Sequence, residues 1–466
     1  MKNLLIIIAF LTLPFLGISQ DITGTWHGNL EVQAGRKMLF IFQISGNESK
    51  LTTEIAIPSQ GAKGLQSHLT TFADGVLIVD ASNLGFKFNG KWNTASRTIE
   101  GSFQEGVNIV PLVLTKESIV EVKPNRPQEP IKPYPYQVED ITFTNQKDNV
   151  TLAGTLTLPN PSQKKPPVVI LISGSGPQDR DESFMTHKPF LVLSDYLTRR
   201  GIAVLRYDDR GFGESTGNFA EGTTADFASD VLSAIDFLKS HPKIDKSKIG
   251  LIGHSEGAII APMVANQSKD VGFIVMLAGT GTSGKFVSYT QSIDNRNFPV
   301  ADQKQFEAYV KEAIDIASTE KETESVKEDL IIFYQNSEML KSLLPAEVNK
   351  KEFIQNLVSV RTSPWMRYFY NYNPVDEIKK IRIPALALYG SKDTQVPPKY
   401  HLQQVKDALA ASKSKHQEVV LLVGLNHIFQ ESKTGLTSEY AQIEQTFAPL
   451  ALETIGNWII NQINNL

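Results

Sequence analysis

Hydrophobic positions follow two different patterns along the chain, and the change occurs at a proline-rich segment. Over residues 20–120, short apolar runs with many β-branched and aromatic residues alternate with turn-forming residues, as in strands joined by tight turns. The clearest runs are residues 37–44, 75–79 and 108–114. The expected turns are Gly46-Asn47, Asp74-Gly75 and Asn89-Gly90. Strands at this spacing predict a small antiparallel β domain, either a barrel or a sandwich.

Residues 121–137 are rich in proline and predict a semi-rigid linker. After it, residues 138–158 have the pattern of an antiparallel hairpin, and buried strand-like runs then alternate with amphipathic helical segments. The runs are residues 168–173, 202–207, 248–253, 272–277, 385–389 and 418–423, with helices such as 225–239 and 400–409 between them. This alternation predicts right-handed crossovers and a mostly parallel sheet, so residues 138–466 are expected to form an α/β domain.

One long interval interrupts the alternation. Residues 283–380 are charged and helix-prone and contain no obvious strand. Because the interval is too long for a plain loop in a compact domain, we expect a helical cap inserted after one strand. An aromatic cluster near its end forms either the cap's own core or the wall of a substrate pocket, with Trp365 and Tyr368 as the pocket candidates.

The first residues have the features of an export signal. Lys2 is followed by a largely apolar run over residues 4–18, with the small residues Gly17 and Ser19 at its end. The alternative is a membrane anchor, but the run is shorter than the about 20 apolar residues that span a bilayer. We expect residues 1–19 to be a signal peptide, cleaved before Gln20, and a periplasmic or extracellular protein without a stable membrane span.

Composition narrows the possible chemistry. The chain is 41% hydrophobic and 21% charged, with a net charge of −4, which suits a globular protein and gives no electrostatic reason to expect nucleic acid as a partner. It contains no cysteine, so disulfides, thiolate metal sites and a cysteine nucleophile are excluded. No spacing of His, Asp and Glu indicates a metal site, and we expect no cofactor.

The strongest chemical signal is Gly253-His254-Ser255-Glu256-Gly257, placed between an apolar strand and a helix of small residues. A serine on a sharp strand-to-helix turn requires glycines two residues to either side, where a Cβ would clash. The turn lifts the serine hydroxyl above the sheet and directs the backbone N–H of Glu256 toward a developing oxyanion. Ser255 is therefore the candidate nucleophile.

A serine nucleophile needs a base, and the base needs a group that orients it. Asp393 lies in a loop after the strand at 385–389, and His427 lies just after the strand at 418–423. Each residue alone is equally consistent with a loop-surface position. Their order and their places at the ends of buried strands make Asp393 the candidate acid and His427 the candidate base.

A second oxyanion donor is expected from Ser173-Gly174-Ser175-Gly176-Pro177, the loop after the strand at 168–173. Its candidate is the backbone N–H of Ser175, with that of Gly176 second. The charged segment 206–215 is expected to be a salt-bridged scaffold, with Glu256 paired to Arg180 or Arg210. His254 is expected to be packed and not catalytic.

These motifs resemble the α/β-hydrolase superfamily, especially its bacterial serine aminopeptidase-like and prolyl-oligopeptidase-like esterases, from about residue 138 to the end. The resemblance implies the triad Ser255, Asp393 and His427 and an oxyanion hole from the N–H groups of Glu256 and Ser175. The chain departs from many esterases, which carry His-Gly in the oxyanion loop. The family contains carboxylesterases, including feruloyl esterases.

The expected activity is hydrolysis of a small-molecule or glycan-linked carboxylic ester through an acyl-enzyme. A peptidase or aminopeptidase uses the same groups on an amide. Less favoured is a non-catalytic glycan- or envelope-binding protein on a hydrolase scaffold. The cap acids Glu320, Glu322, Glu324 and Glu328 alternate with lysines, which indicates a solvated helix face and not an amine-binding pocket. The oligomeric state is not determined by these patterns.

Overall fold

The computed structural model describes residues 22–33, 36–47, 50–58, 62–105, 108–119, 125–160, 165–296, 298–344 and 348–465. The expected signal peptide at residues 1–19 lies outside these ranges. Contacts divide the chain into two compact units, Met1–Glu121 and Val122–Leu466, and each is described by itself.

The first unit is an antiparallel β barrel. Its strands are β1 (Gly24–Gln33), β2 (Arg36–Asn47), β3 (Lys50–Ile57), β4 (Ala62–Gln66), β5 (Leu69–Ala73), β6 (Val76–Ala81), β7 (Phe86–Asn93), β8 (Thr98–Glu105) and β9 (Asn108–Leu114). Neighbours along the path pair antiparallel, and a bridge between His27 and Thr115 joins the two ends of the sheet. Buried aromatic side chains such as Trp26, Phe42 and Phe88 fill the interior. Of the two predicted forms, the barrel is therefore the one adopted.

Of the turns expected in this unit, the one at Asp74-Gly75 is confirmed and the one at Asn89-Gly90 is not. Asp74 and Gly75 join β5 to β6 with positive φ angles of 52° and 75°, as a tight hairpin turn requires. The turn expected at Asn89-Gly90 is wrong, because both residues lie inside β7. A Cβ on Gly90 would come within 2.6 Å of the Phe88 ring and 2.8 Å of Ile99, so this glycine makes room for core side chains.

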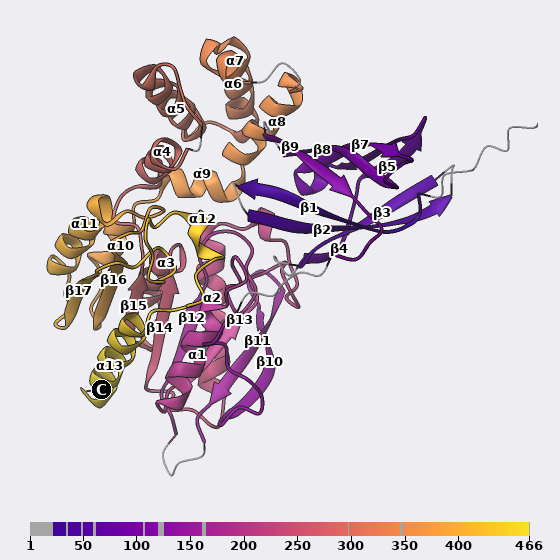
Figure 1. Ribbon diagram of the computed structural model, residues 1–466. Coiled ribbons are helices and arrows are strands. Elements are labelled where there is room, and N and C mark those ends of the chain that lie inside the picture. Colours follow the sequence, from indigo (N-terminus) through magenta and orange to yellow (C-terminus); the bar gives the residue numbers. More distant parts are fainter. Residues whose placement is uncertain are drawn as a thin grey trace, which may run out of the picture. The chain divides into compact units, whose positions relative to one another are not determined.

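The second unit is built on an eight-stranded sheet (Figure 1). Its strands are β10 (Gln137–Asn145), β11 (Val150–Leu158), β12 (Val168–Ile172), β13 (Ala203–Tyr207), β14 (Ile249–His254), β15 (Val271–Leu277), β16 (Ala385–Gly390) and β17 (Gln417–Leu422). The order across the sheet is β10-β11-β13-β12-β14-β15-β16-β17. The hairpin β10–β11 is antiparallel to its neighbours, and from β13 to β17 all pairs are parallel. This confirms the expected α/β-hydrolase fold.

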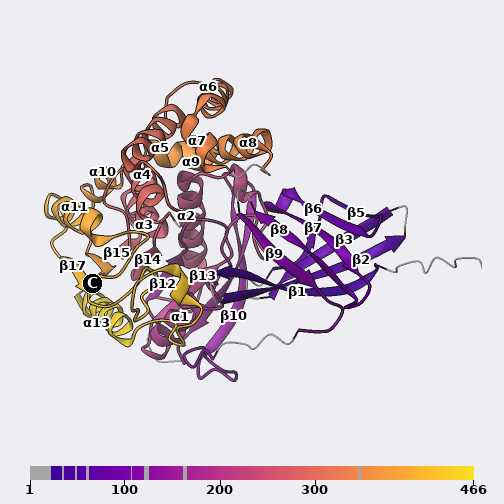
Figure 2. The ribbon, with the colours of Figure 1, turned by 45° about the horizontal axis from the view of Figure 1, so that its top comes forward.

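Helices cover both faces of this sheet, as Figure 2 shows. Helices α1 (Pro189–Arg199) and α13 (Pro449–Asn465) pack on one face. Helices α2 (Thr224–Ser240), α3 (Gly257–Gln267), α10 (Pro374–Ile378) and α11 (Pro398–Ala410) pack on the other. The central strands β12, β13 and β14 are buried along their whole length, because neither face meets water.

The expected cap is a set of helices inserted between β15 and β16, at the top of Figure 1. They are α4 (Gly284–Asp294), α5 (Gln303–Ala317), α6 (Thr323–Asn336), α7 (Glu338–Leu343), α8 (Lys350–Arg361) and α9 (Pro364–Asn371). Their apolar faces form a core of their own, which includes Leu330, Tyr334 and Tyr370. Side chains of the same helices, among them Val287 and Phe369, also pack on Ile259 of the sheet domain.

The proline-rich segment is attached to the hydrolase unit and is not a free spacer. Arg126 donates hydrogen bonds to the carbonyls of Ile443 at 2.7 Å and Ala441 at 2.8 Å. The side chain of Gln128 bonds the backbone of Phe447 at 2.7 Å. Residues 126–136 therefore form a strap that holds the C-terminal loop before α13.

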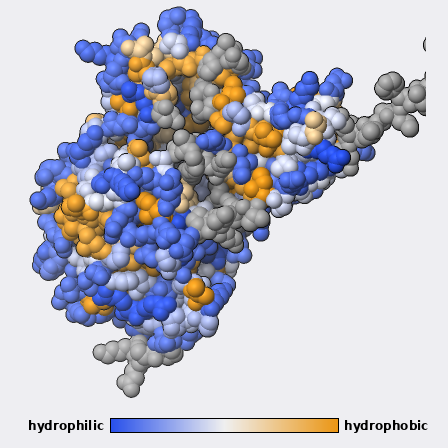
Figure 3. All heavy atoms as spheres, in the orientation of Figure 1, coloured by the Kyte–Doolittle hydropathy of each residue, from blue (hydrophilic) through white to orange (hydrophobic). Residues whose placement is uncertain are grey.

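Hydrophilic residues cover most of the hydrolase unit in the view of Figure 3, and hydrophobic ones form separate patches. Exposed apolar side chains such as Ile332, Val360 and Val423 come from different elements. Among the described residues, no helix has the length and apolar character needed to cross a membrane.

Candidate functional site

Ser255 lies on a strained turn between β14 and α3. Its φ is +53°, in the left-handed region that non-glycine residues rarely adopt. A Cβ on Gly253 would lie 1.9 Å from the carbonyl oxygen of Gly257, and a Cβ on Gly257 would lie 2.1 Å from that of Ile172. Only glycine fits at either position, so the spacing of the motif follows from backbone contacts. The turn presents Ser255 at the carboxyl edge of the sheet.

His427 and Asp393 follow the neighbouring strands β17 and β16. The Nδ1 of His427 lies 2.7 Å from Oδ2 of Asp393, and both side chains are buried. Oδ1 of Asp393 accepts the backbone N–H groups of Gln395 and Val396, each at 2.8 Å. Burial raises the pKa of Asp393, but His427 and the two N–H groups outweigh it and hold that pKa below its usual value. The carboxylate is thus ionised and aligned on the histidine ring.

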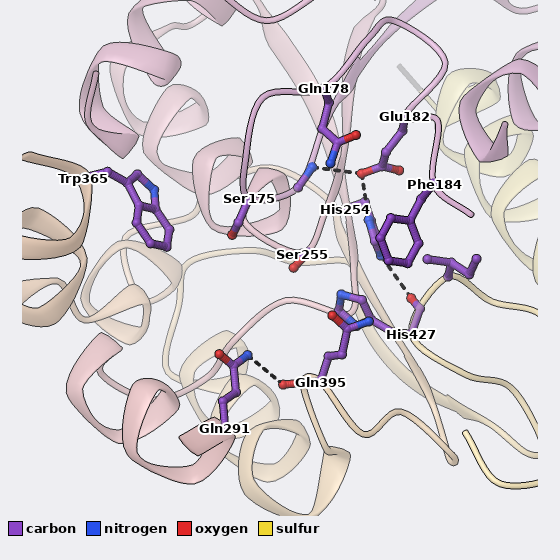
Figure 4. Close-up of a pocket in the computed structure, with 12 residues that line it drawn as sticks. Ser175, Gln178, Glu182, Phe184, His254, Ser255, Gln291, Trp365, Gln395 and His427 are labelled. Carbon is purple, nitrogen blue, oxygen red and sulfur yellow. Dashed lines mark hydrogen bonds and ion pairs between the residues drawn. The ribbon is translucent and has the colours of Figure 1, made fainter. Parts of the chain in front are cut away.

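Ser255 and His427 line one pocket of about 240 Å³ (Figure 4). The other lining residues are Gly174, Ser175, Gln178, Glu182, Phe184, His254, Gln291, Trp365, Gln395 and Ile428. Trp365 lies on the side that the cap covers, whereas Gln395 lies beside the His427 ring. Tyr368 was the other expected pocket residue, but it is not among the lining residues. It stacks on Tyr372 and packs against the core under α3.

Two carboxyl groups hold the loop after β12. Asp209 accepts hydrogen bonds from the Ser173 hydroxyl at 2.7 Å and from the Gln178 N–H at 2.9 Å. Glu182 accepts the N–H of Gly174 at 2.8 Å. A Cβ added to Gly174 would lie 3.1 Å from the Cβ of Ser255, so this loop passes directly beside the serine.

A comparison with protein families matches residues 148–424 to the X-Pro dipeptidyl-peptidase family, S15. This stretch contains Ser255 and Asp393, the strands from β11 to β17, and the cap. The chain belongs to the S15 family. It is therefore a hydrolase, in agreement with the sheet order described above.

Individual relatives of this S15 family member carry esterase names. Esterase EstD of Thermotoga maritima is 27% identical over 333 residues, which cover 71% of this chain and 69% of EstD. The human mitochondrial palmitoyl-protein thioesterase ABHD10 is 31% identical over 144 residues, which cover 30% of this chain and 42% of the thioesterase. Among solved structures, the Pyrococcus furiosus esterase Pf2001 aligns with a TM-score of 0.44 and 17% identity, covering 74% of this chain and 99% of its own.

The prediction that Glu256 pairs with Arg180 or Arg210 is wrong in this S15 family member. Glu256 is buried, and its Oε1 accepts the Thr224 hydroxyl and the indole N–H of Trp365, each at 2.6 Å. Neither Arg180 nor Arg210 is available to it, because each arginine is bound to aspartates of its own. Burial raises the pKa of Glu256 above its usual value, although its hydrogen bonds oppose that shift.

The segment 206–215 is the expected scaffold of ion pairs. Arg180 binds Asp208 at 2.7 Å, and Arg210 binds Asp230 at 2.7 Å. Arg206 pairs with Asp181. Further pairs connect Arg180 to Glu214 and Arg210 to Asp148. These pairs join the end of β13 and the segment after it to α2 and to residues 180–181, so they hold the strands and loops beside the site together.

Glu182 is a site residue that no sequence motif indicates. It binds Nδ1 of His254 at 2.8 Å, and Nε2 of His254 lies 3.0 Å from the carbonyl oxygen of His427. Burial alone would lower the pKa of His254, but Glu182 and the His427 carbonyl raise it above its usual value. His254 is buried as expected, and it connects the loop of Gly174 to the backbone of His427.

Proposed function

We propose that this S15 family member is an exported serine hydrolase that cleaves small, neutral carboxylic esters through an acyl-enzyme. The observation that carries the proposal is the combination of Ser255 on its strained turn with the His427–Asp393 pair at 2.7 Å, in one pocket. A serine hydroxyl becomes a nucleophile when a base aligned in this way removes its proton.

In the proposed reaction, His427 takes the proton of Ser255 while the serine oxygen attacks the ester carbonyl. Asp393 fixes the ring with its proton on Nδ1 and stabilises the imidazolium that forms. The backbone N–H groups of Glu256 and Ser175 stabilise the negative oxygen of the tetrahedral intermediate. His427 then protonates the leaving alcohol, and later it activates the water that releases the acid.

The character of the pocket favours a short, uncharged substrate. Its volume of about 240 Å³ is below the range typical of sites for drug-sized ligands. Three neutral amides, those of Gln178, Gln291 and Gln395, line it. The carboxylate of Glu182 is paired with the ring of His254, and the raised pKa of His254 favours the charged form of that ring. A neutral ester therefore suits this lining better than a substrate with a free ammonium group.

A peptidase is the second candidate, because the family is described by a dipeptidyl-peptidase activity. An aminopeptidase or dipeptidyl-peptidase must bind the free amine of its substrate. The cap acids Glu320, Glu322, Glu324 and Glu328 are exposed, and none of them lines the pocket. The relative EstD is named as an esterase. Both points support the ester over the amide.

The decisive experiment compares kcat/KM for p-nitrophenyl acetate and butyrate with that for alanyl-prolyl p-nitroanilide, each relative to its uncatalysed rate. We expect the greater acceleration for the esters. Greater acceleration of the anilide would replace the esterase proposal with the peptidase. A fluorophosphonate probe should label Ser255, and absence of both labelling and hydrolysis would favour a binding protein on a hydrolase scaffold.

Export is proposed from the N-terminal pattern of residues 1–19 alone. Expression of the full chain in a Gram-negative host should give a periplasmic or secreted protein whose first residue is Gln20. A mature protein that retains Met1 in the cytoplasmic fraction would contradict this part of the proposal.

A further inference from the structure

The side chain of Glu256 is a buried carboxyl group that is held by neutral donors only. It is 4% exposed, and no ion pair to it occurs among the described residues. Its donors are the hydroxyl of Thr224 and the indole N–H of Trp365, each at 2.6 Å. Loss of either bond would leave a buried polar group without its partner, which costs free energy.

The two donors come from two different parts of the domain. Thr224 begins α2, and Trp365 lies on cap helix α9. In Figure 4, Trp365 lies on the same side of Ser255 as Ser175 of the loop after β12. Glu256 therefore joins the cap, helix α2 and the turn of Ser255 through one carboxyl group.

The connection bears directly on the oxyanion hole. One of the two N–H groups assigned to the hole is the backbone N–H of Glu256 itself. Hydrogen bonds from Thr224 and Trp365 to the side chain of Glu256 limit the movement of this residue and so hold its N–H in place. Because Trp365 lies on cap helix α9, the position of the cap also affects that geometry.

We propose that Glu256 is a positioning residue that couples the cap helix α9 to the oxyanion hole through its hydrogen bond with Trp365. This inference rests on the proposed function, since it concerns the same hydrolysis. Burial favours the neutral form of the carboxyl group, which avoids a full negative charge beside a developing oxyanion. The positioning role therefore depends on the acceptor oxygen of the side chain and not on its charge. Glutamine has the same acceptor oxygen without the charge.

The test uses the full chain and compares Glu256→Leu, Glu256→Gln, Trp365→Phe and the Leu/Phe double variant. Trp458→Phe on α13 is the matched control, since it removes an indole outside the pocket lining. Measured quantities are kcat and KM for p-nitrophenyl acetate and the rate of fluorophosphonate labelling. Circular dichroism checks that each variant is folded.

Loss of one oxyanion donor lowers kcat by about 10² to 10³ in a related type of site. We expect Glu256→Leu to lower kcat by about 100-fold with a KM change below fivefold. The kcat of Glu256→Gln should be at least tenfold higher than that of Glu256→Leu. Trp365→Phe alone should lower kcat by about tenfold. In the double variant, kcat should be less than twofold lower than in Glu256→Leu alone. Trp458→Phe should stay within twofold of wild type.

If the loss of kcat in the double variant equals the product of the losses in Glu256→Leu and Trp365→Phe, the coupling is refuted, because independent residues act additively in free energy. A Glu256→Gln enzyme as slow as Glu256→Leu would overturn the role of the acceptor oxygen. If Glu256→Leu does not fold, Trp365→Phe still decides, and a kcat within twofold of wild type would refute the inference. Failure of the wild-type chain to label or to hydrolyse esters would instead refute the proposed function.

Discussion

Replacing Asp393 by asparagine changes one hydrogen bond at the centre of the site. In the native chain, Oδ1 accepts two backbone N–H groups at 2.8 Å, and Oδ2 faces Nδ1 of His427 at 2.7 Å. An asparagine of the same shape keeps the two backbone bonds on its oxygen and turns its NH₂ group toward Nδ1. Two donors cannot bond each other, so the His427 ring moves its proton to Nε2. In that tautomer, Nε2 cannot accept the proton of Ser255.

The expected loss follows from this tautomer change. The same substitution in a chymotrypsin-type triad lowers kcat by about 10⁴ while the geometry is kept. At about 1.36 kcal/mol per tenfold change, this corresponds to about 5.4 kcal/mol of transition-state stabilisation. The fold should remain, because two of the three hydrogen bonds to this side chain survive and its volume is unchanged.

The assay is kcat for p-nitrophenyl acetate on the folded full-length variant, with Asp236→Asn as the matched control. Asp236 lies on α2 with a side chain that is 79% exposed, so its substitution should change kcat by less than twofold. A kcat of the Asp393→Asn variant within tenfold of wild type would refute the assigned role. An acid in another loop would then have to orient His427.

Ser255→Ala should lower kcat by about 10⁶ while the protein stays folded, and near-native turnover would remove the central assignment. Gly257→Ala should lower the free energy of unfolding by about 3 kcal/mol in urea titrations, because its Cβ would lie 2.1 Å from a carbonyl oxygen; an unchanged midpoint would contradict this. Glu439 is partly buried, but hydrogen bonds from the 432–434 loop lower its pKa to about 2; its stabilisation is complete above its ordinary pKa and is lost as pH falls toward 2. Glu439→Gln should therefore flatten the dependence of Tm on pH between about 4.5 and 2, and an unchanged slope would be the contrary result. Deleting residues 1–121 should keep esterase activity, whereas deleting residues 1–137 should also lower Tm through loss of the strap; equal Tm values would show that the strap is not stabilising.

Local patterns in the sequence were sufficient to predict the strands of the hydrolase sheet, their order along the chain and the helical character of the cap. Strands with neither face in water are continuous apolar runs, and helices repeat their apolar residues every three to four positions. The motif around Ser255 was predictable from its glycine spacing, although only Gly253 is required by a contact within the turn, with the carbonyl of Gly257, whereas Gly257 is required by the carbonyl of Ile172 on β12. His427 and Asp393 could be named because each lies shortly after an apolar strand, and parallel strands end at one edge of the sheet. The strand before Asp393 is buried as expected, whereas β17, before His427, is the edge strand and only its last residue, Leu422, is buried.

Other features depended on packing between distant segments. The turn signal at Asn89-Gly90 failed because the glycine makes room for Phe88 and Ile99, a cross-strand contact that neighbouring residues do not indicate. Trp365 and Tyr368 lie three residues apart on α9, yet only the first lines the pocket. Helix periodicity placed both on the cap, but the rotation of that helix over the sheet is set by tertiary contacts.

Charge pairing was the least predictable property. Glu256 was expected to pair with Arg180 or Arg210, but these arginines bind Asp208 and Asp230, and the carboxyl group accepts hydrogen bonds from the neutral donors Thr224 and Trp365. Which carboxylate an arginine binds depends on distances of a few ångströms that only the folded backbone sets. The sequence alone thus determined the chemical groups and their place at the edge of the sheet. The tertiary structure decided which groups hold the loop after β12, because that requires Asp209 and Glu182 to converge on it from separate segments.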